Sequence, residues 1–173
     1  GCNFNTGANV DKRRAFRGSG LQEITLPTSM TNVGVFGSSS LKYLHFANGA
    51  EPTSINERAF SECSSLEFDV SNLPTSITTL GWHCFYGCSK ITGSVNLPNL
   101  TSIAGESFRG SGITGVTDLG SVITSISSCQ FFGCSNLTSV VLPSSCTTLG
   151  DDCFAGCPLT SIDVSNVTTF GIS

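Results

Sequence analysis

The stretch that decides the fold is Leu137–Cys157, which reads LTSVVLPSSCTTLGDDCFAGC. Apolar residues alternate in its first part, which ends at Pro143, and this pattern predicts a short strand. The β-branched block that ends at Gly150 predicts a second short strand. Acidic residues precede Phe154 and a glycine soon follows it, so we expect a single helical turn there.

This stretch is one copy of a repeat, and phenylalanine marks each copy. The markers recur at nearly even spacing and are Phe16, Phe36, Phe60, Phe85, Phe108, Phe131 and Phe154. An aliphatic residue follows each marker by five or six positions. A period of about 23 residues predicts a solenoid, because one coil cannot bury its apolar face alone and stacked coils can. We expect six to seven coils whose strands stack in parallel about 4.8 Å apart.

The pattern Leu-x-x-Val-x-Leu-Pro…Leu-Gly-x-x-Cys-Phe-x-Gly-Cys of residues 137–157 resembles the BspA-type leucine-rich repeat, which has the same period. The resemblance covers residues 15–171 and implies an α/β fold. Specifically, it implies a right-handed leucine-rich repeat solenoid with short parallel strands and single helical turns. Four frames depart from the pattern: the Leu66 frame is shortened, the Ile91 frame carries an insertion before Val95, and the Leu41 and Ile113 frames lack the proline. We expect these departures to affect the local register and not the fold.

Composition and charge exclude several classes of function. Charged residues make up 12% of the 173 residues, about half the ordinary share, and the formal net charge is −4. A nucleic-acid binder normally has a basic stripe, and the run Lys12-Arg13-Arg14 is too short to supply one. The chain contains no apolar run long enough to cross a bilayer, so we expect no membrane span.

We expect a single leucine-rich repeat domain over residues 1–173. Residues 15–171 hold the repeats, and residues 1–14 are expected to form a partial cap or part of a preceding coil. Terminal coils normally need polar caps, and no distinct cap follows the last block. The chain is therefore expected to be a fragment of a longer protein. A lipidated Cys2, as in a mature bacterial lipoprotein, is an open alternative for the N-terminus.

Seven of the nine cysteines fall at positions that other coils fill with small or apolar residues. Those that stand three residues after a marker are Cys63, Cys88, Cys134 and Cys157. A free cysteine behaves as a small buried hydrophobe, so we interpret the cysteines mainly as packing residues. Disulfide bonds between neighbouring coils of this column stay open as an alternative, because adjacent strands bring the Cα atoms within reach.

No signal for catalysis or for a cofactor is found in the sequence. The two histidines are His45 and His83, and no nucleophile elbow, phosphate-binding loop or paired-carboxylate site accompanies them. The sequence His83-Cys84-x-x-x-Cys88 lacks a second ligand pair of matching spacing, so we expect no metal site. The sequence therefore predicts that the protein is not an enzyme, has no catalytic residue and binds no cofactor.

The outward columns of the first predicted strand are the candidate binding face, because side chains alternate across a strand. Binding hot spots are enriched in Trp, Tyr and Arg, and among these residue types the columns contain Tyr43 alone. The best candidate patch is therefore Lys42, Tyr43 and His45. Further candidates along the columns are Glu23, Asp69, Asn96 and Asp163. The single tryptophan, Trp82, is expected in a turn, either as an exposed anchor or as a local packing residue.

These observations predict a non-catalytic recognition or adhesion module on a cell surface or outside the cell. Its expected partner is a host or cell-surface protein or a glycan, bound through the strand face. The family resemblance implies the same role, since such repeats are associated with adhesion to host matrix proteins or to other cells. The alternative is a structural spacer, a repeat array that presents another domain.

Overall fold

The computed structural model of the chain describes residues 16, 19–34, 36–37 and 40–171. The expected N-terminal cap of residues 1–14, Cys2 and the Lys12-Arg13-Arg14 run lie outside the described residues. The elements in the described part are β1 (Glu23–Leu26), β2 (Asn32–Val33), β3 (Tyr43–Phe46), β4 (Ser54–Ile55), the 3₁₀ helix η2 (Val70–Asn72), β5 (Thr79–Leu80), β6 (Ser94–Asn96), β7 (Ser102–Ile103), β8 (Gly115–Asp118), β9 (Ser125–Ile126), β10 (Ser139–Val140), β11 (Thr148–Leu149) and β12 (Thr169–Phe170).

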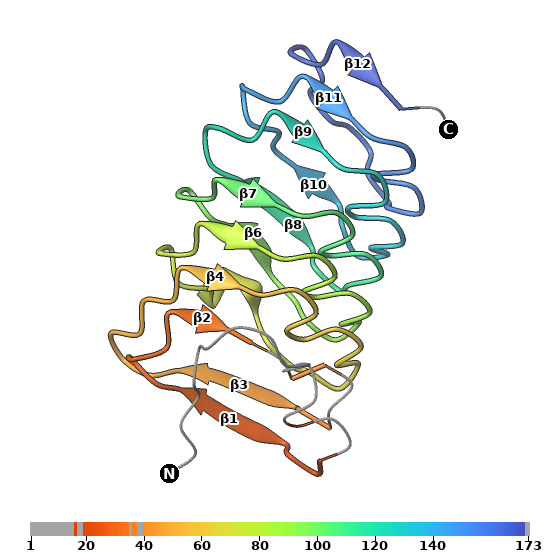
Figure 1. Cartoon of the computed structure of the whole chain (residues 1–173). Coiled ribbons are helices and arrows are strands. Elements are labelled where there is room, and N and C mark those ends of the chain that lie inside the picture. The colour runs from red at the N-terminus through yellow and green to blue at the C-terminus, as the bar shows by residue number, and fades with distance from the viewer. Residues whose placement is uncertain (1–15, 17–18, 35, 38–39, 172–173) are drawn as a thin grey trace.

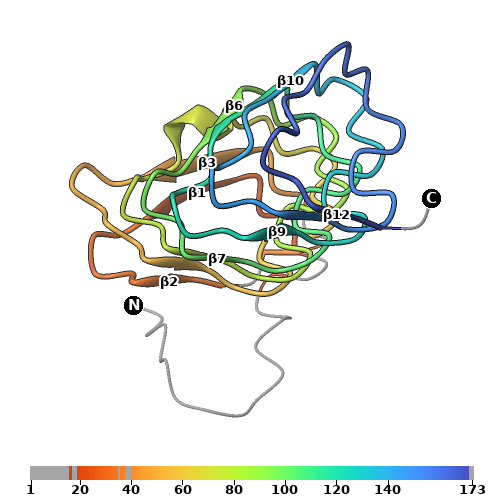
Figure 2. The same ribbon diagram turned by 90° about the horizontal axis from the view of Figure 1, so that it is seen from above.

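The strands stack in parallel in two ladders, one for each strand position of the repeat (Figure 1). The first ladder contains β1–β3 and β6–β8–β10, and the second contains β2–β4–β5–β7 and β9–β11–β12. Seen from above, successive coils lie over one another with the two ladders on opposite sides (Figure 2). The chain is thus a parallel-strand solenoid of about seven turns, which confirms the period read from the sequence.

The first ladder is interrupted at the shortened Leu66 frame and at the Ile91 frame with its insertion. In the Leu66 frame, Asp69 makes a single bridge to Thr92 and then caps η2, accepting a hydrogen bond from the Ser71 amide at 2.9 Å. In the next frame, the pairing of β6 with β8 shifts register between Val95 and Asn96. The shortened frame and the insertion therefore disturb the ladder locally and leave the second ladder intact through β2, β4, β5 and β7.

The segment around each marker phenylalanine is a turn, and the expected α/β class with single helical turns is not confirmed. Among the described residues the helix is η2 alone. The residue two positions before the marker is left-handed, with φ between 52° and 56°, at Arg58, His83, Glu106, Cys129 and Asp152. A right-handed helix cannot pass through such a residue. Alternate amides instead donate to the next coil, as from Arg58 to the Trp82 carbonyl and from Phe60 to the Cys84 carbonyl, both at 2.8 Å.

The marker phenylalanines form a continuous column of rings inside the solenoid. Neighbouring ring centroids lie 5.3–5.8 Å apart, and the ring planes differ by 1–18°. The rings from Phe36 to Phe131 are fully buried, whereas Phe16 and Phe154 at the ends are partly exposed. Such offset stacking of aromatic rings adds to the hydrophobic gain of burial. The described coils therefore share one core. The first and last rings of the column, Phe16 and Phe154, are only partly buried.

Candidate recognition surfaces

Strands β1 and β3 carry a group of polar side chains that we call the strand-face cluster. Its members are Glu23, Lys42, Tyr43, His45 and Glu67. Glu23 lies directly beside Tyr43 in the parallel register, and His45 is two residues further along the neighbouring strand. The His45 Nε2 atom is 3.0 Å from Oε1 of Glu23. Because these side chains are 52% and 65% exposed, the contact contributes at most about 1 kcal/mol to stability.

Within the strand-face cluster, Lys42 contacts both Tyr43 and Glu67. Its Nζ atom is 4.9 Å from the centre of the Tyr43 ring and 3.6 Å from Oε1 of Glu67. A hydrogen bond to Tyr43 and the charge of Glu67 raise the pKa of Lys42 above its ordinary value. The amine is therefore charged at neutral pH beside an aromatic ring that is 38% exposed. The structure thus brings together four of the seven candidate residues that the sequence singled out.

The other three candidate residues lie apart from the strand-face cluster. The Asp69 carboxylate accepts hydrogen bonds from the hydroxyl and amide of Ser71, which lower its pKa. The Asp163 carboxylate accepts from the Ser165 amide at 2.9 Å, and this bond lowers its pKa as well. Asn96 stands beside Asp118 at the register shift of β6 and β8. The two aspartates therefore stabilise turns, as this residue type commonly does.

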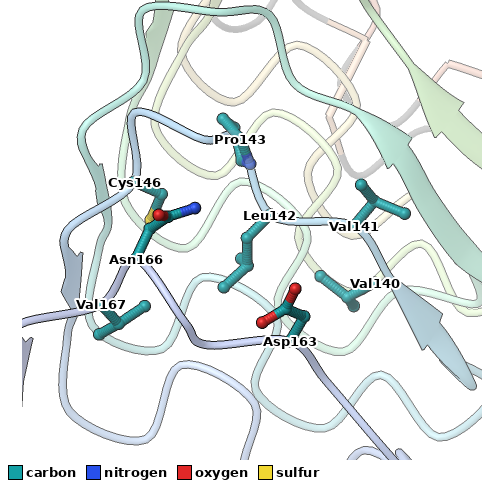
Figure 3. A pocket seen from close by; sticks show the side chains of 8 residues that line it. All are labelled: Val140, Val141, Leu142, Pro143, Cys146, Asp163, Asn166 and Val167. Atoms are coloured by element: carbon teal, nitrogen blue, oxygen red, sulfur yellow. The ribbon is translucent and has the colours of Figure 1, made fainter.

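A shallow hollow of about 140 Å³ lies near the C-terminal end of the solenoid (Figure 3). The side chains around it come from two successive coils and are Val140, Val141, Leu142, Pro143, Cys146, Asp163, Asn166 and Val167. Most of this lining is aliphatic, and the Asp163 carboxylate is already bonded to the Ser165 amide. The hollow therefore offers few free polar groups with which to orient a ligand.

The marker turns of the middle coils carry a second surface, the aromatic–cation ladder. Its members are Arg58, Trp82, His83, Tyr86, Glu106, Arg109 and Phe132. The Arg58 guanidinium lies 4.6 Å from the centre of the Trp82 ring. The His83 ring stacks against both Trp82 and Tyr86, with centroid distances of 3.5 and 4.6 Å. Arg109 lies 6.0 Å from the Tyr86 ring and 4.9 Å from the Phe132 ring. The contacts therefore run without a gap across four coils.

Glu106 ties the aromatic–cation ladder together electrostatically. Its Oε2 atom is 2.8 Å from Nη1 of Arg109 and 3.3 Å from Nε2 of His83. Partial burial raises the pKa of Glu106, but Arg109 and His83 lower it more, so the pKa falls below its usual range. The same hydrogen bond raises the pKa of Arg109. Nε2 of His83 is buried and makes no well-directed hydrogen bond among the described residues, although it lies 3.3 Å from Oε2 of Glu106.

This ladder was not predicted from the sequence, although the position that follows each marker phenylalanine carries a signal for it. Aligned on the marker phenylalanine, the next position outside the core is filled by Gly37, Ser61, Tyr86, Arg109, Phe132 and Ala155. Among the described residues, large side chains occupy this position in the middle coils, and Arg17, which follows Phe16 in the sequence, lies outside the described part of the chain. Each of them looks like an isolated turn residue in the sequence, and only coil stacking places them in one column. Trp82, expected to be an anchor or a packing residue, is half-buried and contacts its neighbours on this edge.

The eight described cysteines are free thiols, and most of them are buried. Burial raises the pKa of Cys84 to about 12 and that of Cys153 to about 11. Within the described residues, no group of three or more His, Cys, Asp or Glu side chains could hold a metal ion. The same part of the chain also lacks any helix of the length and apolarity needed to cross a membrane.

The repeats of this chain match those of a known protein family. The family model described as the BspA type leucine rich repeat region, with six copies, matches residues 3–113 and 53–173. The chain belongs to the BspA-type leucine-rich repeat family. No curated protein sequence matches it. Membership of this BspA-type family is consistent with a non-catalytic repeat module.

Three solved structures share the fold of this BspA-type chain. The leucine-rich repeat protein of T. pallidum has a TM-score of 0.67 and 22% identity, over 91% of this chain and 64% of that protein. A leucine-rich cell surface protein of Faecalibacterium prausnitzii has a TM-score of 0.71 and 25% identity, over 87% and 43%. A leucine-rich repeat protein of Bacteroides ovatus has a TM-score of 0.66 and 23% identity, over 91% and 45%. The chain therefore spans less than two thirds of the length of each of these proteins.

Proposed function

We propose that this chain is a non-catalytic recognition module of a cell-surface or secreted protein, and that it binds a protein or a glycan through the strand-face cluster. The observation that carries the proposal is the cluster itself. It combines an exposed tyrosine with a lysine whose amine is held charged and a histidine beside a carboxylate. Tyrosine supplies contact area at interfaces, and the surrounding charges supply orientation. The cell-surface description of the F. prausnitzii relative supports the location.

An array of extracellular-matrix proteins and glycans, probed with the folded chain, tests this function. We expect at least one array member to bind, and we expect Tyr43→Ala to weaken that binding about tenfold or more, because the ring is the anchor of the cluster. The matched control is Ser139→Ala, which changes an exposed residue on β10 of the same ladder. Equal losses in the two variants would show that the strand-face cluster is not the binding site.

The alternative function is a structural spacer that presents another domain. The observation in its favour is the unbroken column of marker rings from Phe16 to Phe154, since every coil is fixed to the next by stacking and by ladder hydrogen bonds. If the folded chain, at concentrations up to the millimolar range, bound no member of the array, this result would favour the spacer function.

A further inference from the structure

We infer that the aromatic–cation ladder is a second interaction surface, separate from the strand-face cluster, and that its partner is a protein segment that presents carboxylates beside apolar side chains. The composition of the ladder is that of interface hot spots, which are enriched in tryptophan, tyrosine and arginine. Its tryptophan, Trp82, is the single tryptophan of the chain. The inference goes beyond the proposed function and does not depend on it.

The repeat itself does not require these side chains. The position after the marker phenylalanine is Ser61 in one flanking coil and Ala155 in another. Both coils keep the hydrogen bond within the turn, from the Ser61 amide to the Arg58 carbonyl at 3.3 Å and from the Ala155 amide to the Asp152 carbonyl at 3.2 Å. Likewise, the position of Trp82 is filled by Gly105 one coil later. A large side chain at these places therefore adds nothing that the turn or the core needs. The middle coils nevertheless collect one tryptophan, one tyrosine, one phenylalanine and two arginines on a single edge.

The ladder is also held in place before any partner arrives. Each ring has a neighbour on at least one face, and Arg109 is fixed by its 2.8 Å contact with Glu106. The turn backbone beneath is bonded to the next coil, as from the Gly87 amide to the Arg109 carbonyl at 2.8 Å. Immobilising flexible side chains is a main cost of association, so a surface that is already ordered binds more tightly than a mobile one.

The free hydrogen-bonding groups of the ladder define the chemistry of its partner. The Arg58 and Arg109 side chains are 44% and 36% exposed. Besides its contact with the Trp82 ring, Arg58 has one ion-pair contact among the described residues, 3.9 Å from its Nε to Oε1 of Glu57. The indole N–H of Trp82 reaches solvent and donates to no described residue. These three groups are donors beside the Glu106 carboxylate, which is already paired with Arg109, and the positive edges of aromatic rings lie between them. Carboxylate and carbonyl oxygens match this arrangement, and guanidinium groups bind carboxylates particularly well.

A protein segment fits these donors better than a neutral glycan does. The guanidinium of Arg58 covers one face of Trp82, and the His83 ring contacts both Trp82 and Tyr86. Ring faces that are occupied in this way are not free for a flat ligand to lie on. Arg58 and Arg109 stand two coils apart, or about 10 Å at the usual strand spacing, which an extended peptide with two acidic side chains can span.

Trp82 makes the test direct, because tryptophan fluorescence of the whole chain reports on this one ring. The probe is a random copolymer of glutamate and tyrosine, titrated into the folded chain. We expect a saturable change in fluorescence, and we expect Arg58→Gln and Phe132→Ala each to weaken the apparent affinity about tenfold or more. The matched control is Lys90→Gln, which removes a positive charge from an exposed residue of the Trp82 coil that lies outside the ladder.

Several outcomes would overturn the inference. Absence of a saturable fluorescence change would do so, as would an equal loss of affinity in Lys90→Gln and Arg58→Gln, which would indicate non-specific attraction of a polyanion. Dextran that competes with the copolymer would identify a neutral glycan site instead. Loss of copolymer binding in Tyr43→Ala would show that the copolymer binds at the strand-face cluster and not at the aromatic–cation ladder. We expect Tyr43→Ala to bind the copolymer unchanged, so the result for the ladder does not depend on the proposed function of the strand-face cluster. Thermal unfolding of each variant checks that it remains folded.

Discussion

At the scale of single residues, cysteine does more than fill space in this protein. In the column three residues after the marker, each thiol donates to a main-chain carbonyl of the preceding coil, at 3.0–3.2 Å: Cys63 to Phe36, Cys88 to Phe60, Cys134 to Phe108 and Cys157 to Phe131. Ser111 occupies the same position in one coil and contacts the Cys134 sulfur at 3.5 Å. The thiols therefore add a second donor to carbonyl groups that already accept a backbone amide, as the Phe60 carbonyl does from the Cys63 amide at 3.0 Å.

Thiol reactivity provides a prediction at this scale. In a Cys2→Ser variant of the native chain at pH 8, we expect iodoacetamide to label Cys129 first, because that residue is only partly buried. Cys84 is expected to react slowly, since burial raises its pKa to about 12 and the thiolate is the reactive form. Contact with Cys134 and burial raise the pKa of Cys157 as well. Intact-mass measurement over time followed by peptide mapping checks the order of labelling.

The control for this experiment is the same labelling in denaturant. We expect eight labels there, one for each described free cysteine. Six labels would reveal a disulfide bond and contradict the free thiols of the structure. Labelling of Cys84 as fast as that of Cys129 in the native chain would contradict the assignment of Cys84 to the core.

At the scale of the element, the marker turn is the part of the coil that differs most from expectation. Acidic residues before a phenylalanine and a glycine after it favour a helical turn when one coil is considered alone. In the solenoid, the amides of alternate residues donate to the next coil and are lost to any helix. Two left-handed residues per turn, such as Cys129 and Gly133, give the backbone the direction that these bonds require.

A glycine substitution tests the left-handed turn. We expect Gly133→Ala to lower the free energy of unfolding by about 1 kcal/mol, because Gly133 has φ of 71° and alanine is disfavoured there. The cause is backbone strain and not a clash, since the nearest heavy atom to an added Cβ is the Gly110 Cα atom at 4.0 Å. Urea unfolding measures the change.

Gly105→Ala is the matched control for this substitution. A Cβ at Gly105 meets its nearest atom, the Ser127 Cβ, at an ordinary 3.6 Å, and the residue has no left-handed φ. We expect the stability of this variant to lie within about 0.5 kcal/mol of the unsubstituted chain. Equal destabilisation by the two substitutions would contradict the left-handed turn at Gly133.

At the scale of the whole molecule, each coil is stabilised by its neighbours. The core is one continuous cluster, and its ring column provides contacts on both sides of every interior coil. In such an array, stability is approximately a sum of the terms for single coils and for nearest-neighbour interfaces. The last coil has a stacked neighbour on one side, where the rings of Phe131 and Phe154 lie 5.4 Å apart. We therefore expect the free energy of unfolding that is lost when a core phenylalanine is replaced by alanine to depend on the position of its coil along the solenoid.

Two equivalent substitutions test this dependence on position. We expect Phe108→Ala to lower the free energy of unfolding by about 3–5 kcal/mol, because the ring is fully buried between Phe85 and Phe131. Phe154→Ala should cost less than half as much, because that ring is partly exposed and stacks on Phe131 alone among the described rings. Chemical denaturation of both variants, with the exposed-site variant Val122→Ala as the control, makes the comparison. A larger loss in Phe154→Ala would argue against nearest-neighbour stabilisation.

The sequence by itself determined the period, the two strands of each coil and the residues of the core. These follow from burial, since a position that faces inward must be apolar in every coil, and the repeat of Phe85 at Phe108 and Phe131 records that requirement. The same reasoning located the strand-face cluster, because alternation along β3 fixes which way Tyr43 and His45 point.

Only the tertiary structure decided the conformation of the marker turns and the existence of the aromatic–cation ladder. The turn amides find their partners in the next coil, a full repeat away along the chain, so the local sequence around a marker cannot specify the turn. The outward positions of the turn are likewise free to vary from coil to coil, as Ser61 and Tyr86 show. A column on this edge is therefore confined to a few coils, and it forms only because the coils stack about 4.8 Å apart.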